Sequence, residues 1–381
     1  MSGAAILNAL GEAVRPAHAR IPADIESAFD YERHAVHHFE AMAWRHIQGG
    51  SDRNLTLAHN RAAFDGLHLL PRPLADLRGG HTRLQLLGQA LAHPLLLAPV
   101  AYQCLAHPEG ELASVRAAMA LQAGYMASTL SSHTLEEIAA AARAAMQELG
   151  HGAPLWFQLY SQPAREHTLA LLRRAEAAGY QAIVWTIDAS IKRSGFALPP
   201  GVEAANLRGF PSARQTSQAG QGAILLGTPL ADAAPSLADL EWLRAQTRLP
   251  LVVKGVLSPA VAAEAVARGA DALVVSNHGG RVMDGVPAPI EVLPAVRAAV
   301  PGTPLLLDSG VRCGTDAAKA LALGASAVLI GRPQLHALAV GGMLGVAHLV
   351  HLLRTELELA MAQLGCARLE QIGAEAVWRG R

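Results

Sequence analysis

The chain has 381 residues, of which 31 are basic, 31 are acidic and 51% are hydrophobic. Such a chain can bury a large core, and its neutral charge balance argues against nucleic acid or an anionic membrane as a partner. Only 16% of the residues are charged, so we expect a homo-oligomer that covers part of the surface.

The three cysteines, Cys104, Cys313 and Cys366, include no CxxC pair. Cysteines this sparse indicate reduced thiols in a cytoplasmic protein, and we expect neither a disulfide framework nor a bound metal. The first 20 residues lack the layout of a signal peptide. The apolar stretch from Leu335 to Val350 is interrupted by histidines and rich in glycine, which predicts a buried helix and not a membrane span.

Residues 1–93 predict a largely helical N-terminal appendage, with Phe29–His46 as its clearest helix, and residues 94–381 predict a separate architecture. There, short apolar runs alternate with helical segments such as Thr134–Gln147 and Arg165–Ala178. Eight strand–helix units predict an α/β fold, a parallel (β/α)8 TIM barrel. The eight predicted strands are Leu95–Val100, Tyr125–Thr129, Leu155–Tyr160, Ala182–Asp188, Leu251–Val256, Ala272–Asn277, Pro304–Asp308 and Ala327–Gly331.

Two further features refine this organisation. Residues 189–235 form a long loop between the fourth and fifth predicted strands, and a loop of this length is usually a lid or a binding element, or is disordered. Ser258 before Pro259, and Ser236 three residues before Asp239, have the pattern of helix N-caps.

The stretch Ser276-Asn277-His278-Gly279-Gly280-Arg281 follows the sixth predicted strand. Its glycines allow a sharp turn or a close approach to a flat ligand. An imidazole can accept a proton near neutral pH, and a guanidinium can hold a carboxylate with two hydrogen bonds. His278 and Arg281 therefore predict chemistry on a small organic acid.

Polar side chains stand at nearly every predicted strand exit, which is where barrel active sites lie. Two of the exits, Asp308–Arg312 and Ile330–Pro333, combine glycines with arginines in the loops that commonly hold a phosphate. These loops predict a phosphorylated cofactor, and Lys254 is placed to stabilise negative charge on its ring. The polar exit residues are Ser128, Thr129, Gln158, Tyr160, Thr186, Asp188, Lys254, Ser276, His278, Arg281, Asp308, Arg312 and Arg332.

Each of these residues also has an ordinary structural explanation. Asp308 and Arg312 could form a structural ion pair, and Gln158 and Thr186 could fill polar layers of the barrel. The functional interpretation is favoured over these structural explanations because one architecture places all of the residues at the same end of the barrel.

On these residues the chain resembles the family of FMN-dependent 2-hydroxy acid oxidases and dehydrogenases, over about residues 25–375. Ser276–Arg281 is similar to the family signature. Ala98–Gln103 together with His107–Glu111 is similar to the corresponding segments of hydroxymandelate oxidases. The resemblance implies FMN as the cofactor, an (S)-2-hydroxy acid as the substrate, and a homotetramer.

The resemblance also implies individual roles. His278 would take the hydroxyl proton as hydride leaves for flavin N5, Arg281 would clamp the carboxylate, and Tyr160 would bind the reacting oxygen. Lys254 would stabilise the reduced ring. The implied cofactor contacts are Pro99, Val100, Ala101, Ser128, Gln158, Thr186, Lys254, Ser276, Asp308, Gly310, Arg312, Gly331 and Arg332.

The chain departs from the family pattern at two places. The usual substrate-binding tyrosine near the end of the N-terminal helix falls on His46. The usual second carboxylate-binding arginine belongs to a segment that is shortened here after Asp188, and Lys192 or Arg193 is its candidate replacement.

The resemblance therefore implies an FMN-dependent 2-hydroxy acid oxidase or dehydrogenase. Ala101, in its hydroxymandelate-oxidase-like context, favours oxygen as the electron acceptor. One alternative is an FMN enzyme for a larger or modified 2-hydroxy compound, with His46 shaping a different pocket. Another is a flavin-binding protein without turnover, although retention of His278 and Arg281 argues against it.

Overall fold

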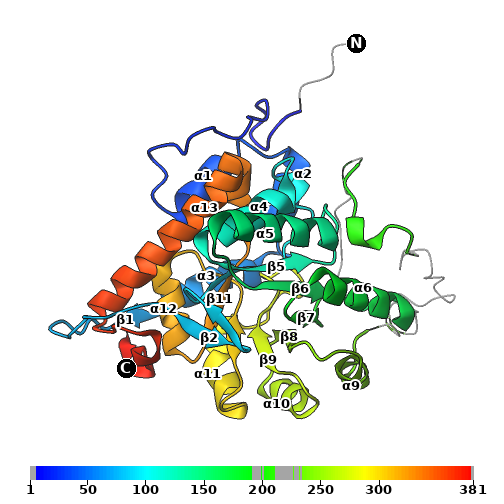
Figure 1. Ribbon diagram of the computed structural model, residues 1–381. Helices are drawn as coiled ribbons and strands as arrows, with labels where there is room; N and C mark the ends of the chain where they lie inside the picture. Colours follow the sequence, from blue (N-terminus) through cyan, green and yellow to red (C-terminus); the bar gives the residue numbers. More distant parts are fainter. Residues whose placement is uncertain are drawn as a thin grey trace.

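A closed barrel of eight parallel strands forms the centre of the molecule (Figure 1), as the sequence predicts. The computed structural model describes residues 6–190, 199, 201–210, 226, 231 and 234–378. The strands are adjacent in chain order, and the last one closes the barrel against the first. They are β4 (Leu95–Leu97), β5 (Gly124–Ser128), β6 (Leu155–Leu159), β7 (Ile183–Thr186), β8 (Leu251–Val256), β9 (Ala272–Val275), β10 (Leu305–Leu307) and β11 (Ala327–Ile330).

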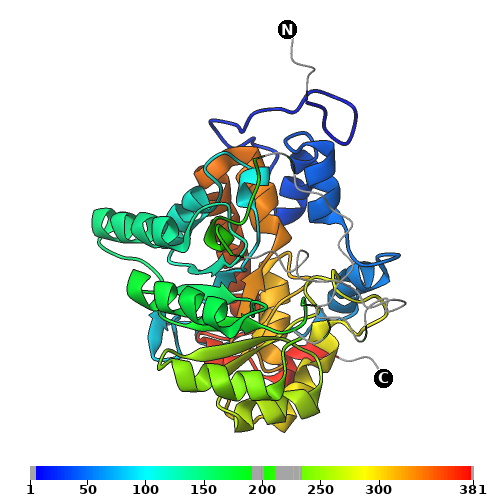
Figure 2. The same ribbon diagram turned by 90° about the vertical axis from the view of Figure 1, so that its right-hand side faces the viewer.

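Helices surround the barrel (Figure 2), and each barrel strand is followed along the chain by one of them. Their ends follow the capping signals in the sequence: Ser258 and Ser236 accept hydrogen bonds from the backbone at the starts of α10 and α9. The helices are α4 (Gly110–Leu121), α5 (Leu135–Leu149), α6 (Arg165–Ala178), α9 (Leu237–Gln246), α10 (Pro259–Ala267), α11 (Pro289–Ala299), α12 (Gly314–Ala322) and α13 (Arg332–Gln363).

The barrel interior is apolar and closed at the amino ends of the strands. Inward side chains such as Met126 and Trp156 pack with Leu86 and Leu91 from a hairpin of β2 (Leu84–Leu86) and β3 (Gln89–Leu91). The Trp156 indole Nε1 donates to Gln89 Oε1 at 2.8 Å, which fixes the hairpin to the barrel. Among the described residues, the hairpin therefore covers the amino ends of the strands and leaves the carboxyl ends as the side for a ligand site.

The predicted helix Phe29–His46 is wrong, because two helices stand in its place: α1 (Ala28–Ala35) and α2 (Ala41–Gln48). The chain leaves the helix at His37 and His38, whose imidazoles bond to the preceding arm, at Glu12 Oε2 and at the Arg15 carbonyl. These tertiary contacts, together with the complete burial of Phe39, replace a helical continuation.

The rest of the N-terminal segment is partly helical and reaches the C-terminal end of the chain. Helix α3 spans Leu55–Asp65, and the short strand β1 (His68–Leu69) pairs antiparallel with β12 (Val377–Trp378). Single-turn 3-10 helices complete the described elements: η1 (Gln103–Leu105), η2 (Ala205–Leu207), η3 (Leu369–Gln371) and η4 (Ala374–Ala376).

Helix α13 is the predicted buried apolar helix. It packs against α1 and α4 (Figures 1 and 2) and is kinked at Gly341 and Gly342. By length and composition it could cross a membrane, but 67% of its most apolar window is buried inside the fold. That burial is the pattern of a core helix.

The loop 189–235 is described only in part, and Lys192 and Arg193 lie outside the described residues. Its described segment is attached to the barrel through Asn206. The Asn206 Oδ1 accepts from Leu135 N at 2.8 Å, and its Nδ2 donates to Ser131 Oγ at 2.9 Å. This segment therefore lies beside the loop that follows β5.

Replacing the buried indole tests how the barrel floor is held. We expect Trp156→Ala to lower the free energy of unfolding by about 3–5 kcal/mol, because it opens a cavity in the barrel and breaks the bond to Gln89. Urea unfolding followed by far-ultraviolet circular dichroism measures the change. Trp378→Ala is the matched control, since that indole is exposed. Equal effects of the two substitutions would contradict this account of the floor.

Candidate functional site

Three polar side chains from neighbouring strands form a buried cluster at the open end of the barrel. Lys254 Nζ lies 2.9 Å from Asp308 Oδ2 and donates to Ser276 Oγ at 3.1 Å. Ser276 Oγ in turn donates to Asp308 Oδ2 at 2.7 Å. Lys254 is only 4% exposed, so its ammonium group depends on this carboxylate for compensation.

The charges of this cluster are stable at neutral pH. Burial by itself would lower the pKa of Lys254, but Asp308 and Asp188 outweigh burial and raise that pKa above its ordinary value. Burial would likewise raise the pKa of Asp308, but Lys254 and the Ser276 hydroxyl hold it below its ordinary value. A cation and an anion are therefore both present beneath the site.

The loop after β9 holds His278 in a backbone conformation that residues other than glycine rarely adopt. His278, Gly279 and Gly280 have φ values of 57°, 67° and 73°, all left-handed. Such a conformation costs a non-glycine residue about 1–3 kcal/mol. The loop is held by the bond from His278 N to Ser276 Oγ at 3.0 Å. Glycine is required at 280, where a Cβ would lie 2.7 Å from Leu57 N.

The His278 ring is oriented by Asp188, to which the sequence analysis gave no role. His278 Nδ1 lies 2.9 Å from Asp188 Oδ1, which favours the tautomer that carries its proton on Nδ1 and its lone pair on Nε2. Burial would raise the pKa of Asp188, but His278 and Lys254 hold it below its ordinary value. The position of Asp188 two residues beyond Thr186, at a strand exit, was the available signal.

A glycine in β8 makes room for this carboxylate. Gly255 has a φ of 105°, and the pairing of β8 with β9 is irregular between Lys254 and Val256. A Cβ on Gly255 would lie 2.5 Å from Asp188 Cγ. The backbone irregularity therefore allows Asp188 to reach His278.

Two buried polar atoms at the ends of β6 and β7 have no partner among the described residues: Gln158 Nε2 and Thr186 Oγ1. The opposite end of the Gln158 amide is held, because Oε1 accepts from Ser128 Oγ at 3.2 Å and from Thr129 N at 3.1 Å. A buried donor without a partner costs about 1–3 kcal/mol. Both atoms are thus placed to bind a polar ligand edge.

Arginines converge at the ends of β10 and β11. The pKa of Arg332 is lowered to about 9 by burial and by Arg281 and Arg312, and burial lowers the pKa of Arg312 as well. Arg312 Nε lies 3.8 Å from Glu32 Oε2. Open space lies beside Gly331, where a Cβ would meet no atom within 4 Å. Half-buried, mutually repelling guanidinium groups beside open space favour the binding of a phosphate.

Arg281 and His46 are brought together, although they are 235 positions apart in the sequence. Arg281 Nη1 donates to the carbonyls of His46, Ile47 and Gly49 at 2.6, 3.2 and 2.9 Å, and Nη2 lies 3.4 Å from His46 Nδ1. Arg332 bonds to the Ile47 and Gly49 carbonyls as well. The carboxyl end of α2 thus forms one wall of the site.

Tyr160 follows β6 and is half-buried. Burial, reinforced by Asp188, raises the pKa of its phenol, whereas nearby Arg281 acts in the opposite direction. The phenol therefore stays protonated and can donate a hydrogen bond. Tyr102 also raises the pKa of Tyr160, so its phenol belongs to the same part of the site. The sequence alone assigned no role to Tyr102.

The remaining predicted cofactor contacts lie in the loops that follow β4 and β10. Pro99, Val100 and Ala101 follow β4, and the strand end is secured by Gln334, whose Nε2 donates to the Ala98 carbonyl at 2.8 Å. Gly310 approaches α3 so closely that a Cβ would lie 2.5 Å from the Asn60 carbonyl oxygen. The residues fit an FMN group: unpartnered donors for a ring edge, a buried ammonium group, and arginines with open space for a phosphate.

Comparison with known proteins identifies the family. The sequence model described as "FMN-dependent dehydrogenase" matches residues 35–379. An L-lactate oxidase of Alicycliphilus denitrificans is 54% identical, over 93% of this chain and 96% of its own length. A 4-hydroxymandelate oxidase of Amycolatopsis orientalis is 43% identical, over 91% and 96%.

Comparison of the fold with solved structures identifies the same family. A crystal structure of mandelate oxidase with 3,3-difluoro-2-hydroxy-3-phenylpropionic acid has a TM-score of 0.82 and 40% sequence identity, and the similarity covers 93% of this chain and 100% of that one. The predicted family and barrel are therefore confirmed. This chain is a member of the FMN-dependent dehydrogenase family, an oxidoreductase whose cofactor is FMN.

Proposed function

We propose that the protein oxidises an (S)-2-hydroxy acid to the 2-oxo acid, with His278 as the base and oxygen as the final electron acceptor. The observation that carries this proposal is the pairing of His278 Nδ1 with Asp188 Oδ1 at 2.9 Å, next to the unpartnered donors of the FMN site. The oxidase activity in the names of the relatives supports the same reaction.

The reaction removes a proton from the substrate hydroxyl and two electrons with one hydrogen from the carbon that bears it. Bound FMN supplies the acceptor for those two electrons and that hydrogen. His278 takes the hydroxyl proton at Nε2, while Asp188 holds the ring and stabilises the imidazolium that forms. An imidazole paired with a partly buried carboxylate is well suited to both tasks.

Two side chains orient the substrate in this proposal. Arg281 is half-buried beside neutral groups, the carbonyls of residues 46–49, and these do not cancel its charge. A substrate carboxylate would provide that compensation through a two-pronged hydrogen bond. Tyr160 keeps its proton and donates a hydrogen bond to the reacting oxygen.

Lys254 supplies positive charge at the FMN ring. Its ammonium group is fixed by Asp308 and Ser276 before any ligand binds, so no reorganisation is needed when negative charge develops.

The direct test is anaerobic mixing of the FMN-loaded protein with a panel of 2-hydroxy acids, lactate, mandelate and glycolate among them. We expect at least one (S)-acid to bleach the oxidised flavin absorbance, and air to restore it. Bleaching by no 2-hydroxy acid would contradict the proposed substrate class. Bleaching without rapid recovery in air would leave the reaction in place and remove oxygen as the acceptor.

The role of His278 has its own test. We expect His278→Asn to slow anaerobic flavin reduction by about 10²–10⁴-fold, the usual contribution of a positioned base, while bound flavin is retained. Stopped-flow absorbance measures the rate. His59→Gln serves as the control, because that imidazole pairs with Glu291 on the surface. Undiminished reduction in His278→Asn would show that another group is the base.

The buried ion pair predicts a pH-dependent stability effect. Asp308→Asn leaves the Lys254 ammonium without its carboxylate, so we expect a loss of about 3–5 kcal/mol at neutral pH. Because the folded pKa of Asp308 is lowered, its contribution is full above the ordinary value of about 3.9 and is lost as the pH falls through the folded value.

Melting temperatures of the two apoproteins, measured from pH 8 down to the acid limit of folding, check this expectation. The difference between wild type and Asp308→Asn should shrink below about pH 4. Asp76→Asn removes the exposed partner of Arg78 and should have little effect. A difference that grows on acidification would contradict the assignment of the pair.

His46 tests the second candidate, an FMN enzyme for a larger 2-hydroxy compound. The contact between His46 and Arg281 favours a role for position 46 in substrate choice. We expect His46→Tyr to change KM for small and aryl-substituted acids by different factors, with flavin content unchanged. If the substitution left the KM of every acid unchanged, position 46 would be excluded as a substrate contact. The homotetramer and the cytoplasmic location stay predictions.

A further inference from the structure

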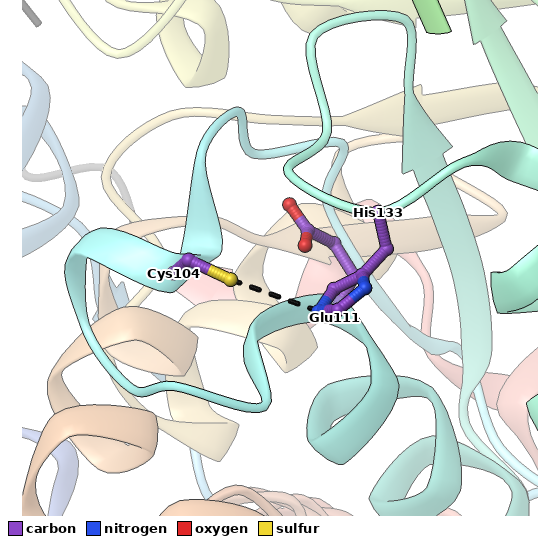
Figure 3. Close-up of side chains that lie close together, drawn as sticks. All are labelled: Cys104, Glu111 and His133. Atoms are coloured by element: carbon purple, nitrogen blue, oxygen red, sulfur yellow. Dashed lines mark hydrogen bonds between the residues drawn. The ribbon is translucent and has the colours of Figure 1, made fainter. Parts of the chain in front are cut away.

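Three side chains with metal-binding atoms lie together beside the mouth of the barrel (Figure 3). Cys104 is in η1 after β4, Glu111 is in the first turn of α4, and His133 is in the loop after β5. One ligand atom from each residue lies within 4.8 Å of the others. The mechanism proposed above uses none of them.

The distance between the thiol and the imidazole matches a zinc site. Cys104 Sγ lies 3.7 Å from His133 Nε2. Zinc binds sulfur at about 2.3 Å and imidazole nitrogen at about 2.0–2.1 Å, so a tetrahedral ion places these two atoms about 3.6 Å apart. The two side chains therefore need almost no movement to share an ion.

Glu111 provides an oxygen that lacks a partner. Its side chain is 0% exposed, and Oε1 accepts from Gln103 N at 3.0 Å and from Ser132 N at 2.9 Å. Its other oxygen, Oε2, has no hydrogen-bond partner among the described residues. A buried carboxyl oxygen without a partner is costly, and a cation would satisfy it.

Glu137, Pro108 and Gly110 lie next to the imidazole or the thiol. Glu137 Oε2 lies 3.9 Å from His133 Nδ1, beyond hydrogen-bonding distance but close enough for its charge to favour a cation bound at the imidazole. Cys104 Sγ also donates to the Pro108 carbonyl at 3.4 Å. Gly110 has a φ of 44°, and a Cβ there would lie 2.8 Å from Cys104 Sγ, so glycine keeps the thiol accessible to its partners.

We propose that Cys104, Glu111 and His133 form a binding site for one Zn²⁺ ion, with a water molecule as the fourth ligand. On binding, the thiol releases its proton to the solvent, the three side chains replace water ligands of the ion, and no electrons are transferred. The thiolate, imidazole and carboxylate set suits zinc better than the oxygen-preferring ions magnesium and calcium.

The ion would join two loops that border the substrate side of the barrel. Cys104 is two residues from Tyr102, whose backbone N donates to the Leu130 carbonyl at 3.1 Å in the loop that carries His133. Zinc would add a strong link to this weaker one and hold Tyr102 near Tyr160. The chemistry assigned to His278 does not require the ion.

Cobalt(II) is the probe, because its tetrahedral thiolate complexes absorb at longer wavelengths than oxidised flavin. The FMN-loaded protein is treated with a chelator, desalted and titrated with cobalt(II), then with zinc(II). We expect intense visible bands that saturate at one equivalent and disappear when zinc displaces cobalt. Absence of these bands in the wild type would overturn the proposal.

Variants test each ligand. Cys104→Ser and His133→Gln should lose the bands, and Glu111→Gln should lose or weaken them while its amide oxygen still accepts both backbone bonds. Cys366→Ser is the matched control: it removes a thiol that donates to carbonyls elsewhere and should keep the bands. Bands that persist unchanged in Cys104→Ser would place the ion on other residues and overturn the proposal.

A second measurement guards against variants that fail to fold. Flavin content and far-ultraviolet circular dichroism should be the same in all the variants. One equivalent of zinc should raise the melting temperature of the wild type and of Cys366→Ser, and leave that of Cys104→Ser unchanged. Equal stabilisation of all three proteins by zinc would contradict the site.

Discussion

The buried pair of Lys254 and Asp308 is the interaction on which the site depends. Two charges placed inside a barrel mouth must compensate each other, and the hydroxyl of Ser276 joins them. The same hydroxyl accepts from the backbone of His278, so the strained loop is attached to the ion pair. The ends of β8, β9 and β10 are thus locked together, and the base is positioned by a network that exists before any ligand binds.

A second constraint comes from the arginines. Arg281 and Arg332 both donate to carbonyls at the end of α2, so hydrogen bonds run from the barrel to the N-terminal segment. Those carbonyls satisfy the donors without neutralising them. The site therefore retains positive charge for two anions, the cofactor phosphate and the substrate carboxylate, and residues 46–49 take part in building it.

The loops after β4 and β5 contribute in another way. They meet at Glu111, which bonds to the backbone of both, at Gln103 N and Ser132 N. Cys104 and His133 contact each other beside this carboxylate, with Sγ 3.7 Å from Nε2, and a zinc ion there would stiffen the loop that carries Tyr102. The cluster of Cys104, Glu111 and His133 would then link the stability of these two loops to access to the substrate pocket.

The sequence by itself determined the eight strands, the polar strand exits and the signature Ser276–Arg281, because strand–helix alternation and strand-end chemistry are local patterns. It could not place the break between α1 and α2, which contacts to Glu12 and Arg15 decide. Only tertiary structure paired Asp188 with His278, 90 positions apart, through the irregular backbone at Gly255. It also brought His133 to Cys104, a grouping that the absence of a CxxC motif had argued against. Such pairings depend on how neighbouring strands and loops are set in register, which no local pattern encodes.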